Sequence, residues 1–255
     1  MRWLPALALT LALAACTGDP GTTASTGSED LPREVGPTVT LSPSRPLAGR
    51  TVVIDPGHQL GNGAHPTEIN ALVDAGGFMK ACNTTGTATS DGYPEATFTW
   101  QVALELRRQL RVLGARVVLT RSSNSEHEWG PCVDERGRSA ARGDLMVSLH
   151  GDGSLAPDAH GFHVISAPGV KGSQALARDL RAGLVAAGLT PSTYTGVRGL
   201  DSREDLGTLN LAERPAVMVE LGNMRHLDDA SLMTSRRGRA RYADALVSGI
   251  RRHLR

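Results

Sequence analysis

The stretch Thr51-Val-Val-Ile-Asp-Pro-Gly-His58 decides how the rest of the chain is interpreted. The short apolar run after Thr51 predicts a strand that is buried on both faces. Pro56 and Gly57 cannot continue this strand, so the chain turns there and His58 follows the turn at once. Ligands of open α/β sheets bind at the carboxyl ends of the strands, which is where this histidine is placed.

Similar apolar runs recur at residues 116–120, 145–149, 161–165 and 215–220. Amphipathic or helix-forming segments alternate with them at residues 94–113, 133–142 and 173–187 and from residue 229 onward. This alternation predicts an α/β fold, a mostly parallel twisted sheet with helices on both faces. We expect one domain over residues 49–255, with a long polar segment at residues 59–93 in which residues 68–80 form a short helix or a hairpin.

The N-terminus has the pattern of an export signal. Arg2 precedes an apolar run that ends in Leu13-Ala-Ala-Cys16 and is too short to span a bilayer stably. We therefore expect a signal peptide over residues 1–16 with a lipobox, in which Cys16 is acylated, and a flexible tether over residues 17–48. The alternative is an ordinary secretory peptide in which Cys16 is incidental. Either reading predicts an exported protein of the cell envelope, membrane-anchored through the lipid or otherwise periplasmic or secreted.

Export changes the interpretation of Cys82 and Cys132, because two remaining thiols in an oxidising compartment usually form a bridge. A disulfide between them is favoured over metal ligation or two free thiols, since neither cysteine lies in a CxxC or CxH arrangement. The formal net charge of +1 gives no electrostatic reason to expect a nucleic-acid partner or an anionic surface.

Four side chains that can carry chemistry are expected to meet at one edge of the sheet. His58, His150 and Glu220 each follow or end a predicted strand, and Glu95 lies in the first turn of a helix on its inward face. A buried carboxylate is costly unless it is paired or bound to a metal. Two imidazoles and one carboxylate are the ligands of an open catalytic zinc site, and a further carboxylate can act as general base and acid.

The chain resembles a known family in five segments, which follow one another in the order that the family has. They are Asp55-Pro-Gly-His58, Glu95 before a long helix, Val118-Leu-Thr-Arg121, Ser148-Leu-His150 and Val219-Glu-Leu-Gly-Asn223. From about Thr51 to the C-terminus, the chain is similar to the zinc-dependent N-acetylmuramoyl-L-alanine amidases of the AmiC type (amidase_3).

This resemblance implies a catalytic domain with the phosphorylase/hydrolase-like amidase fold. It implies one Zn²⁺ per chain, held by His58, Glu95 and His150, and Glu220 as the catalytic acid and base. The substrate would be peptidoglycan or its muropeptide fragments, cleaved at the amide between N-acetylmuramic acid and the L-alanine of the stem peptide.

The chain departs from the family pattern after Glu95, which precedes Ala-Thr-Phe and not a lysine. Glu68 also lies between the two histidines and is the alternative third ligand. Arg121, Arg198 and Asn223 are candidates for contacts with stem-peptide carboxylates or sugar groups, although a structural role for Arg121 is an equal alternative.

Two other functions stay open from the sequence. One is a zinc hydrolase of the same fold that acts on another peptide or amide. The other is a non-catalytic lipoprotein that binds the cell wall, which would not need the four site residues. We expect a monomer that meets the membrane only through a lipid anchor.

Overall fold

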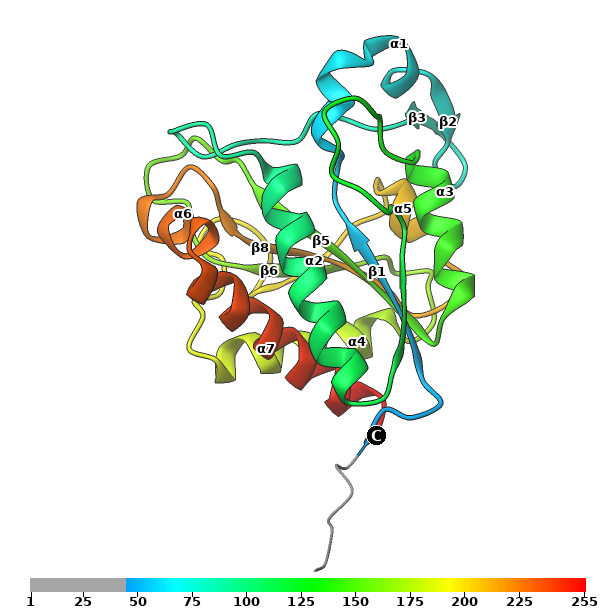
Figure 1. The fold of residues 1–255 in the computed structure, drawn as a ribbon, viewed down its shortest axis with the longest axis vertical. Helices are drawn as coiled ribbons and strands as arrows, with labels where there is room; N and C mark the ends of the chain where they lie inside the picture. The colour runs from blue at the N-terminus through cyan, green and yellow to red at the C-terminus, as the bar shows by residue number, and fades with distance from the viewer. Residues whose placement is uncertain (1–44) are drawn as a thin grey trace, which may run out of the picture. The chain divides into compact units, whose positions relative to one another are not determined.

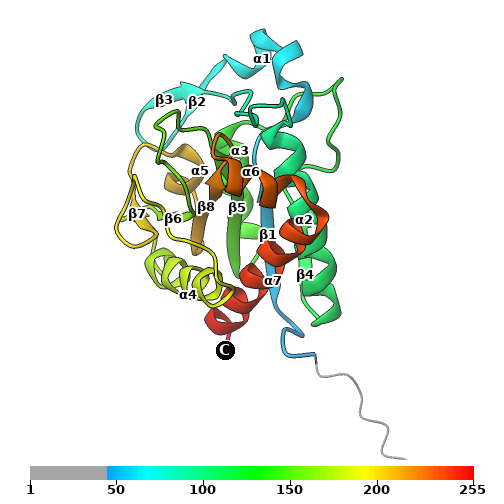
Figure 2. The same cartoon turned by 90° about the vertical axis from the view of Figure 1, so that its left-hand side faces the viewer.

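The computed structural model describes residues 45–255, which form a six-stranded sheet covered by helices and a separate two-stranded hairpin (Figures 1 and 2). The strands are β1 (Thr51–Pro56), β2 (Leu72–Asp74), β3 (Met79–Ala81), β4 (Arg116–Leu119), β5 (Leu145–Asp152), β6 (His163–Ser166), β7 (Leu200–Ser202) and β8 (Ala216–Asn223). The α-helices are α1 (Pro66–Ile69), α2 (Glu95–Val112), α3 (Val133–Arg138), α4 (Ser173–Ala186), α5 (Gly207–Asn210), α6 (Leu227–Thr234) and α7 (Arg236–His253). Two short 3₁₀ helices, η1 (Leu60–Ala64) and η2 (Ser139–Arg142), complete the elements.

The large sheet has the strand order β4-β1-β5-β8-β6-β7. Strands β4, β1, β5 and β8 are parallel, whereas β6 runs antiparallel to β8 and β7 runs parallel to β6. The prediction of an α/β fold with a mostly parallel sheet is therefore confirmed. Because β1, β5 and β8 are parallel, their carboxyl ends share one edge of the sheet.

Both faces of the sheet are buried, and alternate residues of β1 show how. Val52 and Ile54 belong to the larger core, together with side chains of α2, α4 and α7. Val53 points to the opposite face and packs in a smaller core with Ala140 and with Leu209 of α5. A strand with helices on both sides must be apolar throughout, which is why this run lacks the polar alternation of a half-exposed strand.

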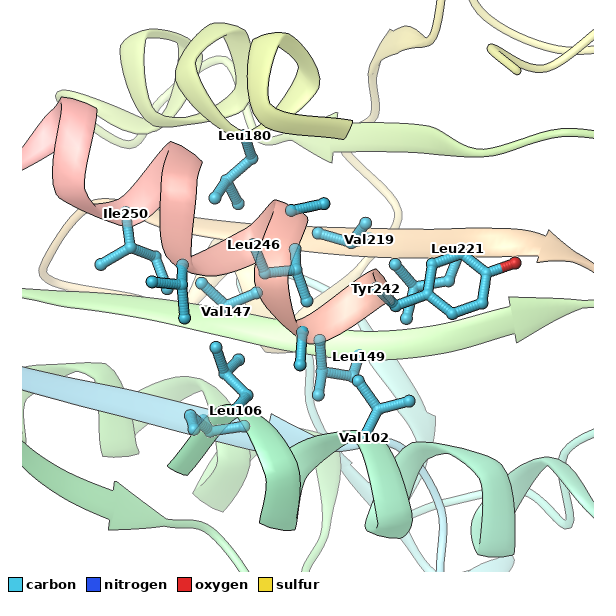
Figure 3. Packing of buried hydrophobic residues seen from close by; sticks show 14 of the residues in the cluster. Val102, Leu106, Val147, Leu149, Leu180, Val219, Leu221, Tyr242, Leu246 and Ile250 are labelled. Atoms are coloured by element: carbon cyan, nitrogen blue, oxygen red, sulfur yellow. The ribbon is translucent and has the colours of Figure 1, made fainter. Parts of the chain in front are cut away.

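Figure 3 shows the larger core in detail. Side chains of β5 and β8 pack there against side chains of α2, α4 and α7, which all belong to the core on the same face of the sheet. Leu106, Leu180 and Leu246 are fully buried members of this cluster. Complete burial of a leucine side chain contributes about 1.5–3 kcal/mol, so this layer fixes the three helices against the sheet.

The N-terminal boundary of the domain differs from the prediction. Residues 45–48, expected as the end of the tether, form part of a turn in which Leu47 is 2% exposed and donates its backbone N–H to the carbonyl of Leu113. The signal peptide, Cys16 and the rest of the tether lie outside the described residues. Within residues 45–255 no helix has the length and apolar character needed to cross a membrane.

Two details within the domain go beyond what the sequence pattern predicts. The segment at residues 190–210 contains β7 and α5, and both are too short to produce a periodic pattern. The C-terminal helical region is divided into α6 and α7 at Ser235, whose side chain accepts a hydrogen bond from the N–H of Gly238 and so begins a new helix.

The segment at residues 59–93 lies above the carboxyl ends of the strands and contains the β2–β3 hairpin, one of the two forms expected for it. Its end is tied to α3 by a disulfide between Cys82 and Cys132, as predicted. Cys132 occupies the N-cap of α3, and the N–H of Val133 donates to the carbonyl of Cys82. The disulfide thus joins the polar segment at residues 59–93 to the start of α3.

Candidate active site

His58 is held in an uncommon backbone conformation just beyond β1. Its φ is +59°, in the left-handed region that non-glycine residues rarely adopt. The ring is fixed from outside the site, because Nδ1 lies 3.0 Å from the carbonyl oxygen of Thr84. A carbonyl only accepts, so Nδ1 carries the proton and Nε2 is free to face Glu95, whose Oε2 is 3.3 Å away. Strained backbone at such a position is typical of functional sites.

Glu95 is the first residue of α2 and is 3% exposed. One carboxylate oxygen lies 2.9 Å from Nδ1 of His150, and the other accepts the N–H of Thr87 at 2.9 Å. Burial raises the pKa of Glu95, but the neighbouring imidazoles of His58 and His150 outweigh burial and hold the pKa well below its ordinary value. Glu95 is therefore a buried carboxylate in its charged form, placed between two imidazoles.

His150 ends the buried part of β5 and contacts an ion pair on its other side. Nη2 of Arg136 donates to Nε2 of His150 at 3.0 Å, and the same guanidinium forms hydrogen bonds to both oxygens of Asp55. Burial lowers the pKa of His150, which favours the neutral imidazole. The neutral form is the one that binds metal ions.

Two glycines allow the imidazoles to come this close. A Cβ at Gly57 would lie 2.4 Å from the His150 ring. At Gly86, where φ is +76°, a Cβ would lie 2.7 Å from Oε2 of Glu95 and 2.8 Å from the His58 ring. The backbone turns themselves therefore form part of the wall around the three side chains.

The three side chains form a group that could hold a metal ion. One ligand atom from each of His58, Glu95 and His150 lies within 4.8 Å of the others. Two imidazole nitrogens and one carboxylate oxygen are a donor set that suits zinc. Glu68, the alternative ligand, is on α1 instead, and its Oε2 lies 3.8 Å from Nδ1 of His65. The structure thus brings Glu95, and not Glu68, to the two histidines.

Glu220 lies on β8 beside this group. It is the register partner of His150 on β5, and on the antiparallel side it pairs with His163 of β6. Its Oε2 is buried without a hydrogen-bond partner. Burial, followed by the charges of Glu95 and Asp152, raises the pKa of Glu220 well above its ordinary value. A carboxyl with a raised pKa and a free oxygen can both accept and donate a proton near neutral pH.

His163 is a packed residue of strand β6 and is 3% exposed. Its position opposite Glu220 nevertheless makes it part of the surroundings of the site, and its Nδ1 is also buried without a partner. Nothing in the sequence pattern distinguishes it from an ordinary residue of a buried strand.

The candidate substrate contacts are placed differently from one another. Arg121 is 6% exposed, and its three nitrogens donate to oxygens of the protein, including the carbonyls of Pro56 and Ala96. Nδ2 of Asn223 donates to two carbonyls of the loop after β5, at Ser154 and Ala159. Both side chains therefore organise loops around the sheet edge.

Arg198 is exposed and lies in the loop before β7 with a φ of +53°. Its carbonyl accepts a hydrogen bond from Nε of Arg181, which fixes the backbone and leaves the guanidinium outside this contact. Contact of Arg121, Arg198 or Asn223 with substrate stays a prediction.

A cavity of about 190 Å³ adjoins the imidazoles. It is lined by His58 and His150 on one side and by Lys80 of the hairpin and Leu206 on the other. Nζ of Lys80 donates to the carbonyl of Asp205 at 2.8 Å, which joins the hairpin to the segment before α5. The sequence analysis did not identify Lys80, Arg136 or Asp55 as parts of the site, because their roles depend on partners far away in the chain.

Comparisons with known proteins agree with this geometry. Residues 52–252 match the Amidase_3 family, N-acetylmuramoyl-L-alanine amidase. An N-acetylmuramoyl-L-alanine amidase of Mycobacterium tuberculosis is 46% identical over 213 residues, which cover 80% of this chain and 86% of that protein.

Solved structures of two further relatives superpose well on the domain. The apo form of the N-acetylmuramyl-L-alanine amidase from Mycobacterium abscessus has a TM-score of 0.77 and 45% identity, over 82% of this chain and 100% of that chain. The corresponding enzyme from Mycobacterium smegmatis has a TM-score of 0.76 and 42% identity, over 82% of this chain and 98% of that chain.

Proposed function

Because the chain belongs to the N-acetylmuramoyl-L-alanine amidase family and is a hydrolase of an amide bond in peptidoglycan, we propose that it is a zinc enzyme. It cleaves the bond between N-acetylmuramic acid and the L-alanine of the stem peptide. The observation that carries the proposal is the meeting of His58, Glu95 and His150 within 4.8 Å, with Glu220 as the strand neighbour of His150.

The residues fit a zinc ion by their chemistry. Burial favours neutral His150, Glu95 is held charged, and Thr84 orients the ring of His58 from behind. Such contacts behind the ligands fix the donor atoms and are a regular part of metal sites in proteins. A zinc ion bound here supplies Lewis-acid activation of water and of the scissile carbonyl.

Glu220 moves the proton in the proposed reaction. Its carboxylate accepts a proton as water attacks the carbonyl carbon, and its carboxyl returns that proton to the amide nitrogen as the C–N bond breaks. The raised pKa of Glu220 suits both steps, because a group that must accept and then donate works best with a pKa near the ambient pH. The N-acetylmuramic acid and a free stem peptide are the products.

The place of action follows from the substrate. Peptidoglycan lies outside the cytoplasm, so we propose export by the signal peptide at residues 1–16 and anchoring by a lipid on Cys16. We also propose that the domain acts as a monomer, with the tether before it.

Digestion of purified peptidoglycan followed by mass spectrometry tests the reaction. The expected products are intact stem peptides with a free L-alanine N-terminus and peptide-free glycan. Products in which the sugar–peptide bond is intact but a peptide bond is cut would show a hydrolase of another specificity.

Three matched Glu→Gln variants test the site. Glu220→Gln should lose hydrolysis by at least about 100-fold and still bind one equivalent of zinc, because it removes only the proton-transfer group. Glu95→Gln should lose both zinc and activity, and Glu68→Gln should keep both. Zinc content by elemental analysis is read beside activity, and loss of zinc in Glu68→Gln but not in Glu95→Gln would overturn the assignment.

A further inference from the structure

The end of the domain opposite the candidate active site carries a cluster of exposed arginines, which we call the basic pole. Its members are Arg45, Arg50, Arg111, Arg116, Arg251 and Arg252, and all six are exposed. The last turns of α2 and α7 and the start of β1 and β4 meet here (Figures 1 and 2). The pole is thus formed by segments that are far apart in the sequence.

Backbone and side-chain contacts show that the pole is continuous. The N–H of Arg116 donates to the carbonyl of Arg50, and the guanidinium of Arg50 lies 3.4 Å from the carbonyl of Leu254, just beyond α7. The side chain of Arg45 lies beside Gly114, directly after α2. These contacts bring Arg45, Arg50 and Arg116 together beside the ends of α2 and α7, which carry the other three arginines.

The charges of the pole are not neutralised within the domain. None of its six guanidinium groups forms an ion pair with a carboxylate in the described part of the chain, whereas Arg108, Arg138 and Arg203 elsewhere on the surface each do. Two carboxylates border the pole and offset part of its charge. Asp144 accepts the backbone N–H of Thr51, and Asp179 lies 3.0 Å from the ring of His253, so neither forms an ion pair with the six guanidinium groups.

The pole lies at the far end of the sheet from the candidate active site. Strand β1 begins beside Arg50 and ends just before His58, so its six residues separate the two regions by about 20 Å along the strand. The described chain also enters the domain at Arg45, within the pole. A surface bound at the pole would consequently leave the catalytic edge facing away from it.

The chemistry of the pole fits an anionic lipid surface. Guanidinium groups bind phosphate oxygens in a bidentate manner and are weakly hydrated. Val112 lies among the arginines and is 68% exposed, so it offers an apolar side chain to the headgroup region. We propose that the basic pole docks on anionic phospholipid headgroups and orients the catalytic edge outward from the membrane. This contact departs from the sequence-based expectation of membrane contact only through a lipid anchor, because the net charge of the whole chain does not reveal a local cluster of arginines. It does not depend on acylation of Cys16 or on the reaction that the enzyme catalyses.

Vesicle co-sedimentation with residues 45–255 tests the proposal. The domain is suitable on its own because the solved amidase from Mycobacterium abscessus aligns over 100% of its chain with 82% of this one. Binding is expected to vesicles that contain phosphatidylglycerol and not to vesicles of phosphatidylcholine alone, and it should weaken as salt is raised. Equal binding to both kinds of vesicle, or to neither, would refute the proposal.

The two ends of α7 provide matched variants. Arg251→Gln with Arg252→Gln removes two charges from the pole, and Arg236→Gln with Arg237→Gln removes two exposed charges about 22 Å away along the same helix. The pole variant should bind anionic vesicles about 25-fold more weakly, since each arginine near such a surface contributes about a fivefold factor. The control variant should bind within about twofold of the unmodified domain, because its charges lie more than two Debye lengths from the pole.

Equal loss in the two variants would show that overall charge and not the pole determines binding. If the pole variant unfolds, as judged by its thermal transition, Arg50→Gln with Arg116→Gln replaces it under the same expectation. Binding to soluble polyphosphate as tight as binding to vesicles would assign the pole to an anionic polymer and overturn the lipid proposal.

Discussion

Replacement of Asp55 by asparagine tests its buried ion pair with Arg136, whose guanidinium also contacts His150. Asp55 is 0% exposed and accepts hydrogen bonds from Arg136, Thr120 and Ser148. Asp55→Asn keeps the size of the side chain but leaves the buried Arg136 charge without its partner. Removal of one member of a buried pair costs about 3–5 kcal/mol, a large share of the stability of a typical domain.

Urea unfolding at neutral pH measures this loss of unfolding free energy. The midpoint of thermal unfolding should also fall, by roughly 6–20 °C. The exposed pair of Glu105 and Arg108 provides the control, since Glu105→Gln should cost about 0.5 kcal/mol or less. A loss below about 1 kcal/mol in Asp55→Asn would refute the reasoning, because it would mean that Arg136 finds another partner or water at no great cost.

The pH dependence of the same variant gives an independent check. Arg136 and the neighbouring hydroxyls outweigh burial and hold the pKa of Asp55 below its ordinary value. A carboxyl with a lowered pKa stabilises the folded state fully above its unfolded pKa, about 3.9, and loses that contribution as the pH falls below it. The difference in stability between the unmodified protein and Asp55→Asn should therefore shrink between pH 5 and pH 3, as followed by urea titrations at each pH.

Three further predictions concern the walls of the site. Gly86→Ala should lower hydrolysis at least about 10-fold, because its Cβ would lie 2.7 Å from Oε2 of Glu95. The control Gly77→Ala, with a φ of +102° and open space around it, should cost only about 1 kcal/mol of strain. Activity and unfolding assays separate the two variants, and equal activities would count against the close-contact argument. Replacement of both Cys82 and Cys132 by serine should lower the free energy of unfolding by about 4 kcal/mol, the chain-entropy value for a sequence separation of 50 residues. An unchanged free energy of unfolding in urea titrations would contradict this prediction. Asn223→Ala should cost about 1–3 kcal/mol, because two buried loop carbonyls lose their donor, and a variant as stable as the unmodified protein would show that water replaces the amide.

The candidate site could be predicted from the sequence because each of its residues comes at a change of local pattern. His58 and His150 follow apolar strands, and parallel strands bring their carboxyl ends to one edge, so their proximity needed only the fold class. Glu95 could be preferred to Glu68 from its inward position on a helix. The choice between them still required tertiary structure, since both lie between the two histidines in the chain.

Contacts between distant segments were beyond the reach of local pattern. Asp55 and Arg136 are 81 residues apart, and nothing in the short helix α3 distinguishes Arg136 from its exposed neighbours. Arg121 shows the opposite case. From the sequence, a substrate contact and a structural role were equal alternatives for Arg121, and in the structure its guanidinium donates to carbonyls of the protein. The sequence gives the position of a charged group, but its partners depend on how the segments pack.

The disulfide between Cys82 and Cys132 makes the assembly of the site depend on the redox state of the compartment that the chain occupies. It joins the segment that holds the ring of His58, through Thr84, to the helix that carries Arg136 and so reaches His150. In a reducing compartment the two thiols are unlinked, and the two halves of the histidine environment are then connected only by noncovalent contacts. Under the export that we propose, the restraint is added only after the chain has left the compartment in which it is made. Formation of the disulfide outside the cytoplasm therefore completes the restraint on the site in the compartment where the substrate is found.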